Sequence, residues 1–258
     1  MSRGIWDRET VALVLLGAIF PIAVTWLSVA GAEGLWRLVF FLVVAGIWHL
    51  VWMLARAQPP SFAGVLTALA LALLAPQELG LPALVLSTSF GVVMAELAFG
   101  GWGRNVLNPA VVTLAFMGFG YPAAPWPELA VQIGWAALPA ALIGMVFGVM
   151  APGILLGAAL AFGVAWLAGV DFTASYAAIA VVLVVLVAEP VASAATAPGR
   201  WLNGLLYGGL VTLFVVAWEG AAPVQLAVSA ALFTSLAAPL FDEIAIGLWV
   251  LKRKKRHG

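Results

Sequence analysis

The 258-residue chain contains no cysteine, only two histidines and few charged residues. The lack of cysteine excludes disulfides, cysteine-ligated iron–sulfur clusters and cysteine-rich zinc sites. The histidines give no pair for haem ligation within a bilayer, since His257 lies in a charged tail and we expect His49 to be interfacial. Charged residues make up 9% of the chain, against about 25% in soluble domains, so water is not its main solvent. We expect no metal site and no nucleic-acid partner.

Apolar residues, 65% of the chain, form segments that suit a bilayer, which a helix crosses with about 20 residues. We expect an all-α membrane protein with about ten transmembrane helices in a single polytopic domain, residues 1–258. The expected helices are residues 11–30, 36–55, 61–76, 82–99, 106–120, 129–150, 153–169, 172–188, 201–218 and 223–250. The third, fifth and eighth are short, and we expect Pro239 to interrupt the tenth. We also expect the first to be a retained span rather than a cleaved signal peptide.

Cationic residues support this number of spans. Ten spans place both termini on one side, together with most of the cations: Arg3, Arg8, Arg56, Arg104, Arg200 and the basic tail 251–258. The opposite loops carry one cation, Arg37, and five acids: Glu33, Glu78, Glu128, Asp171 and Glu219. Because cytoplasmic loops are rich in Lys and Arg, we expect both termini in the cytoplasm of a bacterium with the protein in its inner membrane. The tail is then a topology anchor near anionic lipid.

Two similar stretches suggest an internal repeat. Residues 60–64 open the third helix, which ends at Pro76, and residues 170–175 open the eighth, which ends at Pro190. Helices five apart enter a membrane from opposite sides. The sequence therefore predicts two inverted five-helix repeats, residues 1–120 and 121–250, with short or broken helices around a midplane site.

A first polar cluster follows Glu96. Its glycines, arginine and asparagines are Gly100, Gly101, Gly103, Arg104, Asn105 and Asn108. The glycines allow tight turns, and the asparagines, three apart, should share a face of the fifth helix, which Asn108 would cap before Pro109. One interpretation is a capped re-entry loop. The other is a site where free backbone N–H groups and two amides bind a polar, partly anionic, planar ligand.

A second polar cluster runs from Glu189 to Arg200, after a very apolar stretch. A glutamate at that depth is typical of a functional site, although a carboxylate that reaches the interface from a helix end also fits. Glu96 has the same two interpretations. Arg104 and Arg200 are each available for ion pairing with the glutamate of their own loop. Asp242, beyond Pro239, suggests a further polar position.

Three motifs in these regions carry a family resemblance. Residues 100–110 match G-G-x-G-x-N-x-x-N-P-A in full, and residues 238–242 match A-P-L-x-D. Residues 187–199 match A-T-D-P-V-x-S-x-x-T-x-x-G, with Val-Ala in place of Ala-Thr and Glu189 in place of Asp. Over most of residues 58–250 the chain resembles the NqrB/RnfD subunits of the bacterial Na+-translocating NADH:quinone oxidoreductase and the Rnf ferredoxin:NAD+ complex.

The resemblance implies a subunit of a membrane oxidoreductase complex, with no catalytic residue of its own, rather than an enzyme alone. Electrons would pass through a non-covalent flavin (riboflavin or FMN), with quinone and coupled ion movement possible. Partners would be other membrane and soluble redox subunits, such as flavin or iron–sulfur proteins. The first-cluster residues Gly100, Gly101, Gly103, Arg104, Asn105 and Asn108 would line the flavin pocket. Glu189, Ser193, Thr196 and Asp242 would complete its polar wall or an ion path.

One departure from the family concerns covalent flavin. The family attaches FMN to a threonine in an S-G-A-T motif after the fifth helix, whereas residues 118–128 contain no serine or threonine. Covalent FMN is therefore not expected. Two alternatives to a flavin-bearing subunit are a membrane anchor that docks soluble redox subunits without its own cofactor, and a small-solute or ion channel of similar fold.

Overall fold

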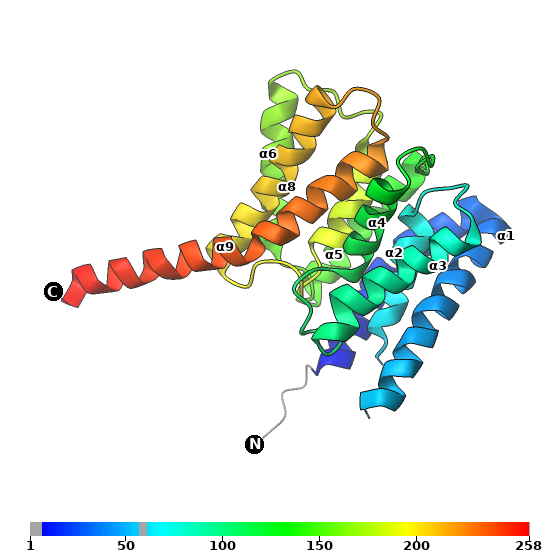
Figure 1. Cartoon of the computed structure of the whole chain (residues 1–258). Coiled ribbons are helices and arrows are strands. Elements are labelled where there is room, and N and C mark those ends of the chain that lie inside the picture. The colour runs from blue at the N-terminus through cyan, green and yellow to red at the C-terminus, as the bar shows by residue number, and fades with distance from the viewer. Residues whose placement is uncertain (1–6, 57–60, 258) are drawn as a thin grey trace.

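The computed structural model describes residues 7–56 and 61–257, which are almost entirely helical (Figure 1). Arg3 and the first residue of the stretch 60–64, both used above, lie outside these residues. The helices are α1 (Arg8–Arg56), α2 (Ala63–Leu74), α3 (Leu81–Gly91), α4 (Pro109–Gly120), α5 (Val131–Val146), α6 (Pro152–Leu167), α7 (Tyr176–Val182), α8 (Ala197–Ala217) and α9 (Pro223–His257). A π turn, η1 (Val92–Glu96), and a 3-10 turn, η2 (Leu97–Phe99), prolong α3, and a second π turn, η3 (Leu183–Val187), prolongs α7.

The long α1 is two helices joined at Gly31, whose φ of 59° and ψ of −139° are not helical. A left-handed φ of this kind suits glycine, which has no Cβ. With this break, the described residues form ten helical segments that follow the ten expected ones in order. Four helices, α1, Leu81–Phe99, α8 and α9, are long and apolar enough to cross a membrane. The protein is a multi-pass membrane protein, and ten crossings stay a prediction.

The short helices were anticipated correctly, but the effect of Pro239 was not. Ala63–Leu74, Pro109–Gly120 and Tyr176–Val187 are all shorter than a full span. Pro239, in contrast, lies inside a helix that continues to His257. Proline removes one backbone hydrogen bond, and helices in membranes tolerate this loss when neighbouring groups compensate.

The two halves of the chain have matching packing. In the first half α1 contacts α2 and α3, and α4 contacts α2 and α3; in the second half α5 contacts α7, α6 contacts α8, and α9 contacts α7 and α8. The halves meet where α1 packs on α5 and α4 on α9. Figure 1 shows α1, α2 and α3 on one side, α6, α8 and α9 on the other, and α4 and α5 between them. This order is compatible with the predicted inverted repeats.

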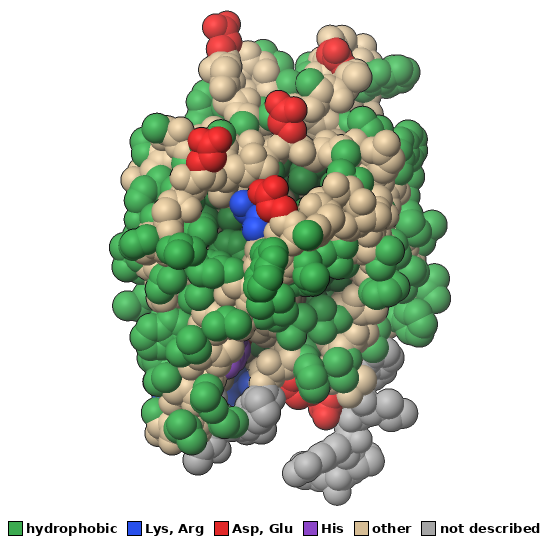
Figure 2. Space-filling model, turned by 90° about the vertical axis from the view of Figure 1, so that its right-hand side faces the viewer, with side chains coloured by type: hydrophobic (Ala, Val, Ile, Leu, Met, Phe, Trp, Pro, Cys, Tyr) green, Lys and Arg blue, Asp and Glu red, His purple; other side chains and the backbone are tan. Residues whose placement is uncertain are grey.

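The surface reflects the membrane environment. Large apolar side chains such as Phe20, Leu54, Phe119 and Val146 are more than half exposed, as expected for groups that face lipid. Figure 2 shows apolar side chains around the middle of the molecule and acidic side chains gathered mainly at one end.

Candidate functional site

A buried carboxylate joins the two polar clusters. Trp102 donates its indole N–H to Glu189 Oε1 at 2.7 Å, and Asn108 donates its amide to Glu189 Oε2 at 2.8 Å. All three side chains are buried, with Glu189 only 3% exposed. Glu189 follows the π turn η3 in the second half, whereas both donors belong to the first half. The carboxylate thus ties together loops that lie more than 80 residues apart in the sequence.

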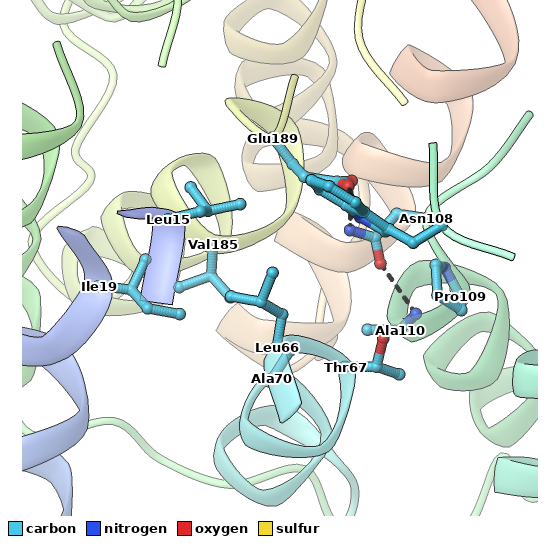
Figure 3. A pocket seen from close by; sticks show the side chains of 11 residues that line it. Leu15, Ile19, Leu66, Thr67, Ala70, Asn108, Pro109, Ala110, Val185 and Glu189 are labelled. Atoms are coloured by element: carbon cyan, nitrogen blue, oxygen red, sulfur yellow. Dashed lines mark hydrogen bonds between the residues drawn. The ribbon is translucent and has the colours of Figure 1, made fainter. Parts of the chain in front are cut away.

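Asn108 also caps the N-terminus of α4. Its Oδ1 accepts from the backbone N–H of Ala110 at 2.8 Å and of Val111 at 3.3 Å, as expected for an N-cap residue followed by proline. The predicted cap is confirmed. Figure 3 shows Glu189 beside Asn108 and the hydrogen bond that Ala110 donates to Asn108. The second interpretation of the cluster required backbone N–H groups that are free to bind a ligand. The N–H groups of Ala110 and Val111 are not free, because they donate to the Asn108 side chain.

The glycine-rich loop is held by bonds within itself. Gly100, Gly101 and Gly103 have φ values of 104°, 90° and 90°, which only glycine adopts readily. The Gly101 N–H bonds to the Glu96 carbonyl, and the Gly103 N–H bonds to Asn105 Oδ1. Asn105 thus lies in the loop before α4, not on a helix face shared with Asn108. The prediction was wrong because a short side-chain bond to the preceding turn competes with helix formation.

A second carboxylate fastens the other end of the Glu189 loop. Asp242 of α9 accepts from the backbone N–H groups of Ala195 and Thr196, each at 2.8 Å, and from Thr196 Oγ1 at 2.6 Å. Thr196 Oγ1 in turn accepts from Gly199 N at 3.1 Å and so caps α8. Residues 189–196 are therefore held at one end by the Glu189 contacts and at the other by Asp242.

Glu96, singled out in the sequence as Glu189 was, lies in a second buried site with a partner that the sequence did not reveal. Its side chain is fully buried, and within the described residues neither oxygen has a hydrogen-bond partner. His49 Nε2 lies 3.6 Å from Glu96 Oε1, and the His49 side chain is 14% exposed. His49 is therefore mostly buried, with its imidazole against Glu96. Only spatial proximity identifies this pair, because 47 residues separate them in the sequence.

The predicted site residues fall into two groups. Asn108 and Glu189 meet in the first, and Thr196 and Asp242 meet in the second. Ser193 lies half-buried in the loop between them, and Arg104 is exposed beside Gly100. The expected pairing of Glu189 with Arg200 is not seen, because Glu189 is bound by Trp102 and Asn108 while Arg200 donates to the Ala194 carbonyl at 3.3 Å.

The cavities are small for a flavin. The one next to Glu189 has a volume of about 10 Å³, room for about one water molecule. Three others, of about 240, 200 and 240 Å³, lie beside His49, beside Arg37 and between Trp126 and Trp218. Pockets for ligands of flavin size usually measure about 300–1,000 Å³. None of these four cavities fits a flavin, and the polar side chains beside the smallest already bind one another.

The Asp242 contacts give a first prediction. Asp242→Asn should cost about 1 kcal/mol, because the amide can no longer accept from every donor and the site is partly open to water. Hydrogen exchange, followed by mass spectrometry, should become faster at residues 193–196. Glu243→Gln, an exposed neighbour, should leave the rate unchanged. Equal rates in the wild type and Asp242→Asn would show that Asp242 does not hold the loop.

The sequence matches a described family. Residues 6–130 match the model of the NQR2, RnfD, RnfE family. Over 125 residues the chain is 34% identical to the NqrB protein of the Na(+)-translocating NADH-quinone reductase of Klebsiella pneumoniae, an alignment that covers 47% of this chain and 29% of that protein. It is 25% identical over 277 residues to the corresponding protein from Stutzerimonas stutzeri, and 28% identical over 276 residues to the one from Neisseria meningitidis serogroup B.

The coverage of these matches differs between the halves. The Stutzerimonas and Neisseria alignments cover 83% of this chain and 67% of the relatives, and so extend into the second half. The family model covers the glycine-rich loop and Asn108 but ends before Glu189. The chain is distantly homologous to these proteins over most of its length, yet it matches less than a third of the Klebsiella protein.

Proposed function

We propose that this chain is the membrane subunit of a multi-subunit redox complex related to NADH-quinone reductase. The premise is that the chain belongs to the NQR2, RnfD, RnfE family. In this complex it serves as an electron-transfer subunit of the inner membrane, with both termini in the cytoplasm, and not as an enzyme alone. The single observation that carries the proposal is the Glu189 bridge. It brings the two motif-bearing loops, one from each half, into one buried unit.

The bridge has a physical role that suits such a subunit. A cofactor that carries electrons needs a fixed position relative to its neighbours, and the protein supplies that position. Glu189 and Asp242 fix residues 189–196, while Asn108 and the left-handed glycines fix residues 100–108. Both loops are thereby fastened by hydrogen bonds within this chain. Their exposed residues, Gly103 and Arg104 among them, are then available to a partner subunit.

The cavity volumes determine where a flavin belongs in this proposal. Because the four cavities are too small, a non-covalent flavin would lie at a surface that this chain shares with another subunit, next to the loop 100–105. Arg104 is exposed there and free to contact an anionic group of a cofactor or partner. Quinone as acceptor and coupled ion movement are further parts of the proposal that rest on the names of the relatives.

The second candidate function is a membrane anchor without its own cofactor. The same small cavities favour it. The two candidates differ in flavin content at the shared surface, because an anchor would leave the flavin entirely on its partners. They agree that the chain assembles with redox subunits.

The test is to purify the tagged full-length chain from its own membranes in mild detergent. We expect it to bring down an assembly that oxidises NADH or reduced ferredoxin and contains iron–sulfur or flavin subunits. We also expect membranes from a deletion strain to lose that activity and to regain it with the gene restored. Unchanged activity in the deletion strain, together with a chain that purifies alone, would eliminate both candidates.

A further inference from the structure

The buried pair of Glu96 and His49 lies where the second part of α1 packs against η1, the extension of α3. Within the described residues, buried side-chain atoms at this contact lack a hydrogen-bond partner: both oxygens of Glu96, His49 Nε2 and Trp52 Nε1. Buried polar atoms are nearly always hydrogen-bonded, so exceptions gathered in one place call for an explanation. Glu96 lines none of the four cavities, so a ligand at its oxygens must be very small.

Two arginines lie near Glu96, but both bind backbone carbonyls. Arg8 Nη1 donates to the Trp102 carbonyl at 3.2 Å, and Arg56 Nη1 donates to the Leu97 carbonyl at 3.4 Å. In the described part of the chain, neither arginine forms an ion pair with Glu96. The carboxyl group therefore has no permanent cation to balance a negative charge.

The other groups around Glu96 disfavour a negative charge on it. Glu9 and Glu189 are acidic groups close enough to repel a carboxylate at this position. The backbone N–H of Trp102 lies nearby without completing a hydrogen bond. A buried charge without a partner is so costly that the group neutralises itself instead. The surroundings of Glu96 thus favour a carboxyl group that carries a proton.

His49 turns one ring nitrogen toward this carboxyl group. Nε2 lies 3.6 Å from Glu96 Oε1, somewhat farther than in a hydrogen bond, and a small rotation of either side chain would close the gap. The ring packs on α2 at Gly64, where an added Cβ would lie 2.9 Å from Nε2. The missing side chain at Gly64 therefore leaves room for the imidazole next to the carboxyl group.

His49 also lines the cavity of about 240 Å³ between the second part of α1 and the start of α2. At about 30 Å³ each, several water molecules fit this volume. Its other polar side chain, Ser61, precedes the first residue of α2, so the cavity reaches the end of the bundle. Figure 2 shows a histidine in a recess toward the end opposite the acidic one. His49 thus connects the cavity with the buried Glu96.

We propose that Glu96 is a proton-binding site and that its proton exchanges with water in the cavity through His49. In release, the O–H bond of Glu96 breaks as a bond to His49 Nε2 forms, and the resulting imidazolium gives its Nδ1 proton to water. Uptake runs in reverse. The neutral imidazole accordingly carries its proton on Nδ1 and offers Nε2 as the acceptor. Neither step involves electron transfer, so the site is independent of the proposed redox function.

Infrared spectroscopy of the full-length chain in liposomes tests the bound proton. A protonated carboxyl group has a C=O stretching band separate from those of carboxylates and backbone amides. At neutral pH, the spectrum of the wild type minus that of Glu96→Gln should contain this band. The wild type minus Glu128→Gln, an exposed carboxylate, should lack it.

The absence of a carboxyl band from the Glu96→Gln difference spectrum would overturn the proposal, because Glu96 would then be ionised. The variant should fold, since glutamine is neutral and of nearly the same shape as protonated glutamate. Should it not fold, Glu96→Met takes its place in the same measurement, because methionine is similar in length, adapts to irregular sites and brings no strong polar group.

Transfer to D2O tests the role of His49. The carboxyl band moves to lower frequency as O–H becomes O–D, and the time course gives the exchange rate. His49→Phe should exchange at least about tenfold more slowly than the wild type, because a positioned acid–base group commonly speeds proton transfer by about a hundredfold or more. Met53→Leu, a volume-conserving change in the same cavity, should exchange as the wild type does.

Equal exchange rates in His49→Phe and the wild type would show that the proton reaches water by another route, and would overturn the role given to His49. If His49→Phe does not fold, His49→Leu is measured instead, since leucine is smaller than the imidazole it replaces and also lacks an acid–base group.

Discussion

Replacement of Glu189 by leucine is expected to cost about 2–6 kcal/mol of folding free energy, from roughly 1–3 kcal/mol for each of two buried donors left without an acceptor. The indole N–H of Trp102 and the amide of Asn108 would both lose their partner. Glu189→Gln should cost less, because its amide oxygen can still accept from one of the two donors. Thermal unfolding in detergent measures the effect. At about 2–4 °C per kcal/mol, the midpoint for Glu189→Leu should fall by roughly 4–24 °C.

Two further variants show whether the loss comes from these hydrogen bonds. Trp102→Phe removes one donor and keeps an aromatic ring. The double variant Trp102→Phe with Glu189→Leu should lose less folding free energy than the sum of the two single losses, because the two residues are in direct contact. Glu128→Gln, an exposed carboxylate in the loop before α5, is the control and should unfold as the wild type does. A Glu189→Leu protein as stable as the control would mean that the bridge contributes nothing to the fold.

Gly204→Ala is expected to prevent folding or to destabilise the protein severely. A Cβ atom at position 204 would overlap the backbone carbonyl of Ile154, and no flexible side chain could move aside. A Cβ at Gly157 or Gly208 would also lie too close to the facing helix, at 2.6 Å from its nearest atom. Helices α6 and α8 therefore approach along a strip of small residues, a common arrangement in membrane helix pairs. An added methyl group would force the two helices apart along the whole contact.

Gly209→Ala is the matched control, since it lies on the same helix, one residue beyond Gly208, and has open space around its would-be Cβ. We expect it to be neutral or to stabilise by about 0.5–1 kcal/mol, because alanine is the better helix former. The yield of monodisperse protein and its unfolding midpoint separate the two variants. Similar behaviour of Gly204→Ala and Gly209→Ala would show that α6 and α8 do not pack as closely as described.

Local features of this fold could be predicted from the sequence. The ten helical segments follow from the lengths of apolar runs, because a bilayer sets the length of a span. The cap at Asn108 follows from an asparagine directly before a proline, a pattern that acts within three residues. The short α2 and α4 follow from the same local reasoning.

Contacts between distant residues could not be predicted in this way. The bond from Trp102 to Glu189 joins residues 87 positions apart, and those from Thr196 to Asp242 join residues 46 apart. An arginine near each glutamate in sequence suggested ion pairs instead. The indole and amide took that place because three-dimensional packing brought them to Glu189. Likewise, nothing in the sequence pairs His49 with Glu96, which the packing of α1 against η1 brings together.

The flavin site was predicted from the family resemblance, and the structure agrees with only part of that prediction. The motifs of residues 100–110 and 187–199 predicted side chains that line a pocket. The structure does bring Asn108 and Glu189 together. The cavity beside this pair has space for about one water molecule rather than a flavin. Asn108 and Glu189 are thus in contact, and the role of the predicted site residues in holding a flavin at a surface shared with another subunit stays a proposal.

The most direct measurement is the acid-released flavin content of the complex purified through this chain, compared with that of the chain after it is separated from its partners. The account predicts flavin in the intact, NADH- or ferredoxin-oxidising complex and none in the separated, folded chain. A separated chain that retains flavin in equal molar amount would contradict the placement of the cofactor at a shared surface. A complex without any flavin would contradict the proposed redox role itself.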